Sequence, residues 1–226
     1  SGAVLLKKLR SKGLSEEEST NIINKVSIDI QSLYNPNYNY LIYLIPGLLP
    51  SMMQMIIMLV AVLLISSEFS HNTFGELLEV ANYRLSALII GKSLPHIVIH
   101  TITAFGILSI LFPVFHVPMN GSIFLSLLVY FIFICASFFL GLMISTIVHD
   151  QYMSTEIALF INTPAFIFSG FIYPLWAMPS AHSLFAQVMP FTHFINAFIK
   201  VYFMNTDLNA AFEEIRNLCL FILFSL

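Results

Sequence analysis

Residues 123–148 read IFLSLLVYFIFICASFFLGLMISTIV, a stretch without a single charged side chain. A helix rises 1.5 Å per residue, and about 20 apolar residues are enough to cross the hydrocarbon core of a bilayer. The stretch is therefore predicted to form a membrane-spanning helix. Small residues let such helices approach one another closely, so we expect tight packing along Ala136, Ser137, Gly141 and Ser145.

The composition of the chain points to the same class. Of its 226 residues, 58% are hydrophobic and 9% are charged, whereas a soluble domain carries about 25% charged residues. The expected fold class is all-α, a polytopic helical membrane protein embedded in the lipid bilayer. A net charge of −3, without a dense basic patch, argues against nucleic-acid binding. Cys135 and Cys219 lie in apolar runs and are expected to be buried hydrophobic residues, not metal ligands.

Two domains and five visible spans are expected. The polar residues 1–39 are predicted to form a small helical hairpin outside the bilayer, with Gly13 ending one helix and a capping box at Ser15–Glu18 starting the next, which should run to about Ser32. Both ends of the chain look cut, so we expect a piece of a longer protein. The transmembrane domain is expected over 40–226, with spans at about 40–66, 86–115, 123–148, 155–171 and a truncated 218–226.

Charged residues return after the first span. Glu68 ends a long uncharged run, and Thr73 followed by Glu76 has the pattern of a second capping box. Apolar residues at helical spacing then predict an amphipathic helix over 73–85, lying along the membrane surface. An ordinary surface loop is the alternative interpretation of this segment.

Prolines divide the apolar residues 174–205 into pieces too short to cross a membrane. Two half-helices are expected, at Ser180–Met189 and at Thr192–Met204. Apolar pieces of this length are typical of re-entrant or interfacial segments.

The sequence contains few groups with recognisable chemistry. It has no G-x-x-x-x-G-K-[ST] loop to hold the phosphates of ATP, so energy would come from a partner or a gradient. His96 and His100 have the spacing of a zinc-protease helix, but the glutamate of that motif is missing. They could line a transport pathway or serve a membrane-embedded enzyme. Glu156 could lie at the membrane interface or in a pore.

Several motifs resemble one family of membrane proteins. Residues 67–78, SEFSHNTFGELL, resemble the E-x-x-x-G-T-x-E-x-L-L segment of the permease subunits of type-2 ABC exporters, and Gly91-Lys92 resembles the G-K that opens the next span. Residues 169–179, SGFIYPLWAMP, resemble the S-G-F-x-x-P-x-x-x-M-P element of the family. The tetrapeptides at 190–193 (PFTH) and 33–36 (LYNP) also fit.

The resemblance implies a six-span permease subunit of an exporter that moves a hydrophobic or amphipathic substrate out across the inner membrane. The first span would precede residue 1, and residues 1–39 would end an extracytoplasmic domain. Two permease subunits, identical or different, would assemble with two ABC ATP-binding subunits. ATP and Mg²⁺ would bind to those partners, and this chain would bind no cofactor. The coupling segment 67–85 would be cytoplasmic and the re-entrant segment 174–205 would lie on the outer side.

The resemblance also assigns roles to individual residues. Those expected to couple to the ATPase are Glu68, Thr73, Glu76, Leu77, Leu78 and Arg84. Those expected in a gate or re-entrant element are Gly170, Phe171, Pro174, Met178, Pro179 and Pro190. Apart from the resemblance, the possible pathway residues are His96, His100 and Glu156, because ionisable groups within membrane spans are often functional.

Three positions depart from the family pattern. Asn72 replaces a glycine, Gly75 stands where an acid is common, and Ala81 replaces a proline. Asparagine tolerates the left-handed conformation, so the turn at Asn72 is expected to form. The distribution of lysine and arginine would by itself place the N-terminal hairpin in the cytoplasm, opposite to the side that the resemblance implies. A membrane-embedded enzyme using His96 and His100 and a scaffold without transport are the alternative functions.

Overall fold

In the computed structural model of the protein, the described residues are 2–16, 18 and 38–226. They belong to two compact units, residues 1–38 and residues 39–226, which we describe separately. The second helix predicted to about Ser32 lies almost entirely outside the described residues, as does the predicted break at residues 33–37.

The first unit contains α1 (Gly2–Arg10), whose last turn carries three cations that complement the negative end of the helix dipole. Gly13 follows in the left-handed conformation, as predicted. The predicted capping box is confirmed: the backbone N–H of Ser15 donates to Glu18 Oε2 (3.0 Å), and the N–H of Glu18 donates to Ser15 Oγ (3.2 Å). The backbone N–H and the side chain of Ser15 donate to the Glu18 carboxylate, which stabilises its charged form and lowers the pKa of Glu18.

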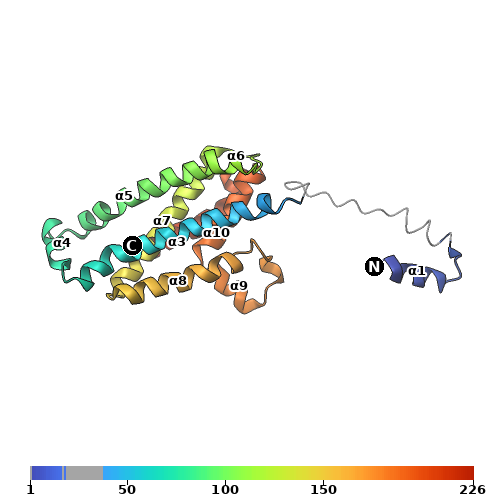
Figure 1. The fold of residues 1–226 in the computed structure, drawn as a ribbon, viewed down its shortest axis with the longest axis horizontal. Coiled ribbons are helices and arrows are strands. Elements are labelled where there is room, and N and C mark those ends of the chain that lie inside the picture. Colours follow the sequence, from blue (N-terminus) through green and yellow to red (C-terminus); the bar gives the residue numbers. More distant parts are fainter. Residues whose placement is uncertain (1, 17, 19–37) are drawn as a thin grey trace. The chain divides into compact units, whose positions relative to one another are not determined.

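The regular elements of the second unit are all helices, and none of residues 39–226 lies in a strand (Figure 1). Its helical membrane fold is the fold class that the composition predicted. The elements after α1, in chain order, are α3 (Tyr40–Ser70), α4 (Phe74–Val80), α5 (Leu85–Gly106), η1 (Ile107–Leu111), α6 (Phe112–Val114), α7 (Ile123–Ile147), α8 (Gln151–Phe168), η2 (Leu175–Ala177), α9 (Ser180–Gln187), α10 (Pro190–Phe198), η3 (Ile199–Phe203), η4 (Leu208–Ala211) and α11 (Phe212–Ser225).

Three helical stretches of the described chain are long and apolar enough to cross a membrane: Tyr40–Ser70, Leu85–Val114 and Ile123–Ile147. The first is capped by Asn39, whose side chain accepts the N–H of Leu41, and it continues through Pro46 and Pro50 without ending. The third stretch, Ile123–Ile147, coincides with the uncharged run at 123–148. That α8 and α11 also cross the membrane stays a prediction. α8 begins at Gln151, earlier than expected, because Asp150 Oδ1 accepts the N–H of Met153 (2.8 Å) and caps the helix.

The interior is built around α7, which packs against α3, α5, α10 and α11. α7 approaches α3 closely at Gly141, where an added Cβ would lie 2.8 Å from the Cβ of Ala61 and 3.1 Å from the carbonyl oxygen of Met58. Ala136, Ser137 and Ser145 are also buried. The tight packing predicted from small residues is therefore confirmed between α7 and α3.

A cluster of aromatic rings packs between α7 and α10. Phe133 stacks on Phe194 of α10, with ring centroids 4.1 Å apart, and Tyr130 meets Phe194 edge-on at 4.7 Å. Both half-helices expected after Pro179 are present, as α9 and as α10 continued by the π-turn η3. The N–H of Gly121 donates to Tyr202 O (2.8 Å), which attaches the loop before α7 to that π-turn. The position of these pieces in a membrane stays a prediction.

Candidate functional site

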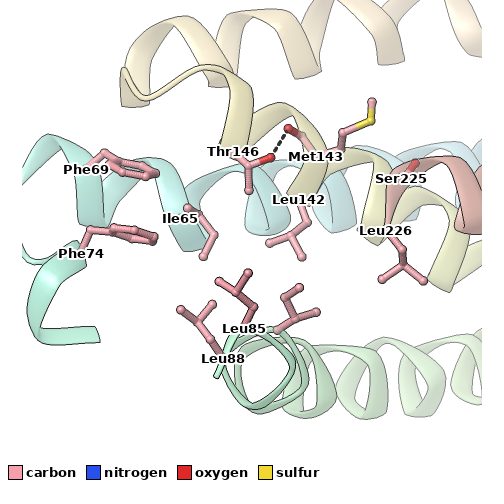
Figure 2. A pocket seen from close by; sticks show the side chains of 11 residues that line it. Ile65, Phe69, Phe74, Leu85, Leu88, Leu142, Met143, Thr146, Ser225 and Leu226 are labelled. Atoms are coloured by element: carbon pink, nitrogen blue, oxygen red, sulfur yellow. Dashed lines mark hydrogen bonds between the residues drawn. The ribbon is translucent and has the colours of Figure 1, made fainter. Parts of the chain in front are cut away.

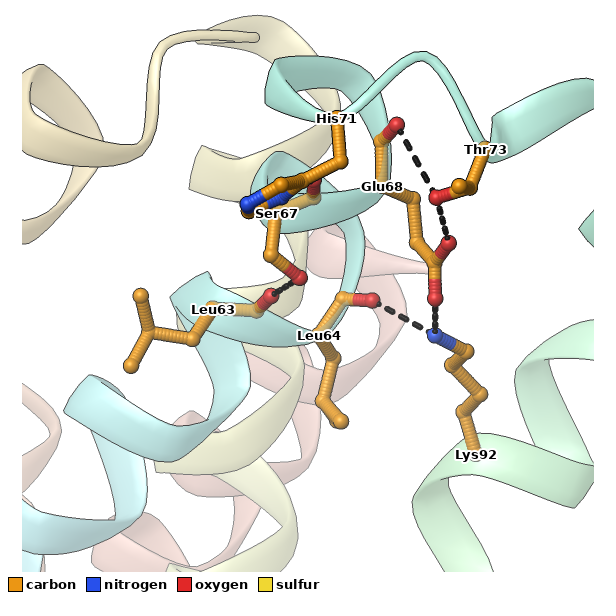
Figure 3. Close-up of polar contacts among 7 residues, drawn as sticks. All are labelled: Leu63, Leu64, Ser67, Glu68, His71, Thr73 and Lys92. Carbon is orange, nitrogen blue, oxygen red and sulfur yellow. Dashed lines mark hydrogen bonds and ion pairs between the residues drawn. The ribbon is translucent and has the colours of Figure 1, made fainter.

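The C-terminal end of α3 carries an ion pair that connects three elements of the fold (Figure 3). Lys92 Nζ on α5 lies 2.5 Å from Glu68 Oε1 on α3 and donates a second hydrogen bond to Leu64 O (2.9 Å). The Thr73 hydroxyl donates to the other carboxylate oxygen, Glu68 Oε2, at 2.5 Å. Glu68 thus holds both α5 and the start of α4, and we call Glu68, Thr73 and Lys92 the carboxylate clamp.

The clamp corrects one expectation. Thr73 was predicted to cap its own helix together with Glu76, but no side-chain hydrogen bond caps α4. The Thr73 hydroxyl donates to the carboxylate of Glu68 instead. An ionised carboxylate is a stronger hydrogen-bond acceptor than a neutral group. The expectation that Asn72 adopts the left-handed conformation is confirmed, with φ 60°.

The amphipathic helix is shorter than predicted. It ends at Val80 because Asn82 and Tyr83 both adopt the left-handed conformation, with φ 50° and 56°. Their N–H groups return to the last turn of α4, with Asn82 donating to Glu79 O (2.9 Å) and Tyr83 to Leu78 O (2.8 Å). The predicted single helix over 73–85 is therefore wrong: Leu85 begins α5, and a sharp turn precedes it.

The two leucines of the motif face inward. Leu77 and Leu78 pack against a cluster whose buried members are Ile65, Leu88 and Leu142. Beside the cluster is an apolar cavity of about 240 Å³ between α3, α5, α7 and the end of α11 (Figure 2). These leucines therefore anchor α4 to the membrane helices and do not form its outer surface.

The outer surface of α4 and the following turn, which we call the tip, consists of other residues. Val80 and Tyr83 are 81% and 71% exposed, and Glu76, Glu79 and Arg84 are exposed beside them. Sequence reasoning identified Glu76 and Arg84 but missed Val80 and Tyr83. Without knowledge of the turn at Asn82, the helical spacing gave no signal that Tyr83 points outward.

A ladder of stacked aromatic rings connects α4 to the turn between α7 and α8. Phe74 of α4 stacks on Phe69 of α3, with centroids 4.2 Å apart, and Phe69 stacks on His149 at 3.9 Å. His149 lies in the turn between α7 and α8. The Ser70 hydroxyl reinforces this contact, since it accepts the N–H of Gln151 (3.1 Å) and donates to His149 O (3.4 Å). A displacement of α4 would therefore reach the start of α8 through direct contacts.

We expect the His149→Ala variant to lose the outer ring of this ladder and to be destabilised by about 1 kcal/mol, the typical contribution of an aromatic pair. His149→Phe keeps a ring at the position and should unfold close to the unchanged protein. The measurement is thermal unfolding of both purified variants in detergent. Equal midpoints for the alanine and phenylalanine variants would contradict a stabilising role of the ladder.

The residues assigned to a gate lie at the opposite end of α3. Phe171 stacks on Tyr43 (5.3 Å) near the start of α3, and the Tyr43 hydroxyl donates to Phe171 O (3.2 Å). The 31 residues of α3 separate the two ends by about 45 Å at 1.5 Å per residue. The carboxylate clamp and the gate residues are therefore brought to opposite ends of the same helix.

The gate residues form a turn followed by short helices. Gly170 has φ +90°, a conformation that side chains rarely adopt, and an added Cβ would lie 2.8 Å from Leu175. Pro174 and Pro179 precede η2 and α9, while Pro190 starts α10 and is buried. Met178 and Pro179 line a shallow hollow with Phe168 and His182.

The proposed pathway residues are not gathered into one site. His100 is buried on α5, whereas His96 is half-buried and stacks on Phe138 of α7, with centroids 6.2 Å apart. Glu156 is exposed on α8 in a hollow with Met153, Ile157 and Phe160. In the described part of the chain, no three His, Cys, Asp or Glu residues are grouped as metal ligands would be.

The family model described as "ABC-2 type transporter" matches residues 17–203. The chain belongs to this family. The match contains the carboxylate clamp, the tip, the aromatic ladder and the gate residues.

Curated relatives of this ABC-2 protein include bacterial and eukaryotic transporters. The chain is 24% identical over 192 residues to the "Probable multidrug ABC transporter permease YbhR" of Escherichia coli (strain K12). The matched region covers 85% of this chain and 52% of the relative. It is 25% identical over 174 residues to the permease YbhS of the same organism, covering 75% and 45%. It is 27% identical over 188 residues to "ABC transporter G family member 20" of Dictyostelium discoideum, covering 81% and 25%. The chain thus spans about half the length of the bacterial relatives.

Proposed function

We propose that this ABC-2 family chain is the transmembrane part of an ATP-driven exporter that moves a hydrophobic or amphipathic substrate out across the inner membrane. ATP and Mg²⁺ bind to a separate ATP-binding subunit, and a second permease subunit, identical or different, completes the transporter. The bacterial relatives are named probable multidrug ABC transporter permeases, which supports a substrate of this class.

The observation that carries the proposal is the construction of the tip. Two large apolar side chains, Val80 and Tyr83, are displayed among charged residues at one end of a 31-residue helix. Exposed apolar groups rimmed by polar ones are typical of protein interaction sites. The tip is held to the membrane helices by the inward-facing leucines and by the carboxylate clamp, so a force on it is passed to α3 and α5 as on a rigid body.

The route from the tip into the membrane helices has two branches. The carboxylate clamp connects the start of α4 to α5 through Lys92, and the aromatic ladder connects α4 to the start of α8 through His149. Both branches begin at the end of α3. Closure of two ATP-binding subunits against the tips would therefore shift α5 and α8 relative to α7, and we propose that this shift opens the opposite end of the bundle.

Co-purification from the native membrane tests the proposal. Full-length protein with an affinity tag should retain an ATP-binding subunit, and Val80→Asp together with Tyr83→Ala should lose it while the protein still folds. The matched control is Trp176→Ala, because Trp176 is an exposed aromatic residue near the gate, at the other end of the fold. Retention of the ATP-binding subunit by the tip variant, or its loss from the control, would contradict the proposal.

A further inference from the structure

Two carboxamide side chains are buried between α3 and α8. Gln54 on α3 is 1% exposed and Asn162 on α8 is 9% exposed. Both reach the sulfur of Met58: Gln54 Nε2 lies 3.7 Å from Met58 Sδ, and Asn162 Nδ2 lies 3.2 Å from it. Asn162 Nδ2 also donates to Ala158 O at 2.8 Å. The two amide groups therefore gather around one sulfur atom in the interior of the bundle.

The oxygen atoms of these amides have no partner. Gln54 Oε1 and Asn162 Oδ1 are buried and accept no hydrogen bond from any described residue. Exchange of the oxygen and nitrogen of Asn162 would place its oxygen against the Ala158 carbonyl, so the assignment is fixed by that contact. A buried hydroxyl can satisfy itself by donating to a carbonyl oxygen one helical turn back. An amide oxygen is only an acceptor, so it needs a donor from another group.

The surroundings define the kind of donor that would fit. The neighbouring buried residues are Met58, Val62, Ile144 and Ala158, and the partly buried ones packed on them are all aliphatic. α3 carries no charged residue over 40–67 and α8 none over 157–168. No carboxylate of these stretches could balance a cation, so a neutral donor is favoured. In a helix bundle surrounded by lipid, bulk water does not reach such groups to satisfy them.

We propose that Gln54 and Asn162 form a binding site for an internal water molecule between α3 and α8. Each amide oxygen lacks a donor, and buried water typically donates to polar groups that are otherwise unsatisfied. The site would add a polar, non-covalent contact between these two helices. This inference does not depend on the proposed transport function.

Radiolytic footprinting tests the site, because hydroxyl radicals formed from a bound water oxidise the side chains next to it. We expect Met58, although fully buried, to be oxidised several-fold faster than Met53, which is buried on the same helix. Exposed Met204, in a loop, is the positive control for solvent. The sample is the full-length protein in lipid nanodiscs. Equal rates at Met58 and Met53 would overturn the proposal, and this comparison needs no variant.

Replacement of both amides identifies what holds the water. In Gln54→Met with Asn162→Leu, which have similar shapes to the native side chains but no acceptor, oxidation of Met58 should fall several-fold to the rate of Met53. If the double variant fails to fold, the two single variants replace it, and each should lower the oxidation rate of Met58. A rate at Met58 that is unchanged in folded variants would overturn the proposal, because water would then reach the sulfur without the amides.

Discussion

Replacement of Glu68 by alanine is expected to release α4 from the membrane helices and to uncouple the two ends of the protein. Lys92 would lose its carboxylate partner and Thr73 its hydrogen bond to the carboxylate at once, and Thr73 would keep only its longer contact with Glu68 O (3.4 Å). The two charged side chains are only 22% and 23% exposed, so the pair is better shielded than a surface ion pair. Hydrogen bonds to charged groups contribute about 1.5–3 kcal/mol each, and we expect a loss of about 2 kcal/mol in the free energy of unfolding.

Thermal unfolding and ATPase assays of the reconstituted complex measure this effect. Glu76→Ala is the matched control for stability, because Glu76 is an exposed carboxylate on the same segment and forms no ion pair with a described residue. Lys92→Met should resemble Glu68→Ala, whereas Lys92→Arg should restore most of the stability. If Glu68→Ala and Glu76→Ala unfold at the same temperature, the carboxylate clamp does not hold the segment.

Replacement of Gly141 by alanine is expected to destabilise the protein even though alanine favours helices. Gly to Ala in a helix interior gains about 0.5–1 kcal/mol from backbone entropy alone. At Gly141, however, the new Cβ would lie 2.8 Å from Ala61 and 3.1 Å from the Met58 carbonyl of α3. Overpacking of this kind costs about 1–3 kcal/mol, so the net effect is a loss, and Gly141→Leu should prevent the packing of α3 on α7.

The matched control is Gly106→Ala at the end of α5, where an added Cβ meets no described atom within 4 Å. The same substitution should therefore have opposite signs at the two sites: a lower unfolding temperature for Gly141→Ala and an unchanged or higher one for Gly106→Ala. Purified protein in detergent, followed by its thermal unfolding, gives both values. A stabilised Gly141→Ala variant would show that α7 does not approach α3 as closely as described.

The long apolar helices and their close packing could be predicted from sequence because both depend on local patterns. The uncharged run at 123–148 predicts a spanning helix by length alone, and Gly141 predicts a close helix contact because it has no side chain. That α3 is the helix it contacts follows only from the structure. Asn72 could be predicted in its left-handed turn for the same reason, since its preference is intrinsic.

The details of the tip could not be predicted because they depend on distant partners. Thr73 has the local pattern of a helix cap, but its hydroxyl donates to the carboxylate of Glu68, which Lys92 of α5 binds at the other oxygen. Apolar spacing continued through Leu85 and predicted one helix, yet the left-handed pair at Asn82 and Tyr83 reverses the chain. The inward orientation of Leu77 and Leu78 can be inferred only once α4 is placed against α5.

The central claim is that ATP hydrolysis on a partner subunit drives transport through the clamped end of α3. The most direct measurement is the amount of an amphipathic fluorescent dye transported per ATP hydrolysed, in liposomes that contain the full-length protein and its ATP-binding subunit. We predict ATP-dependent transport by the unchanged protein, and for Glu68→Ala continued hydrolysis with several-fold less dye per ATP. Transport that needs no ATP, or an unchanged ratio in Glu68→Ala, would contradict the account.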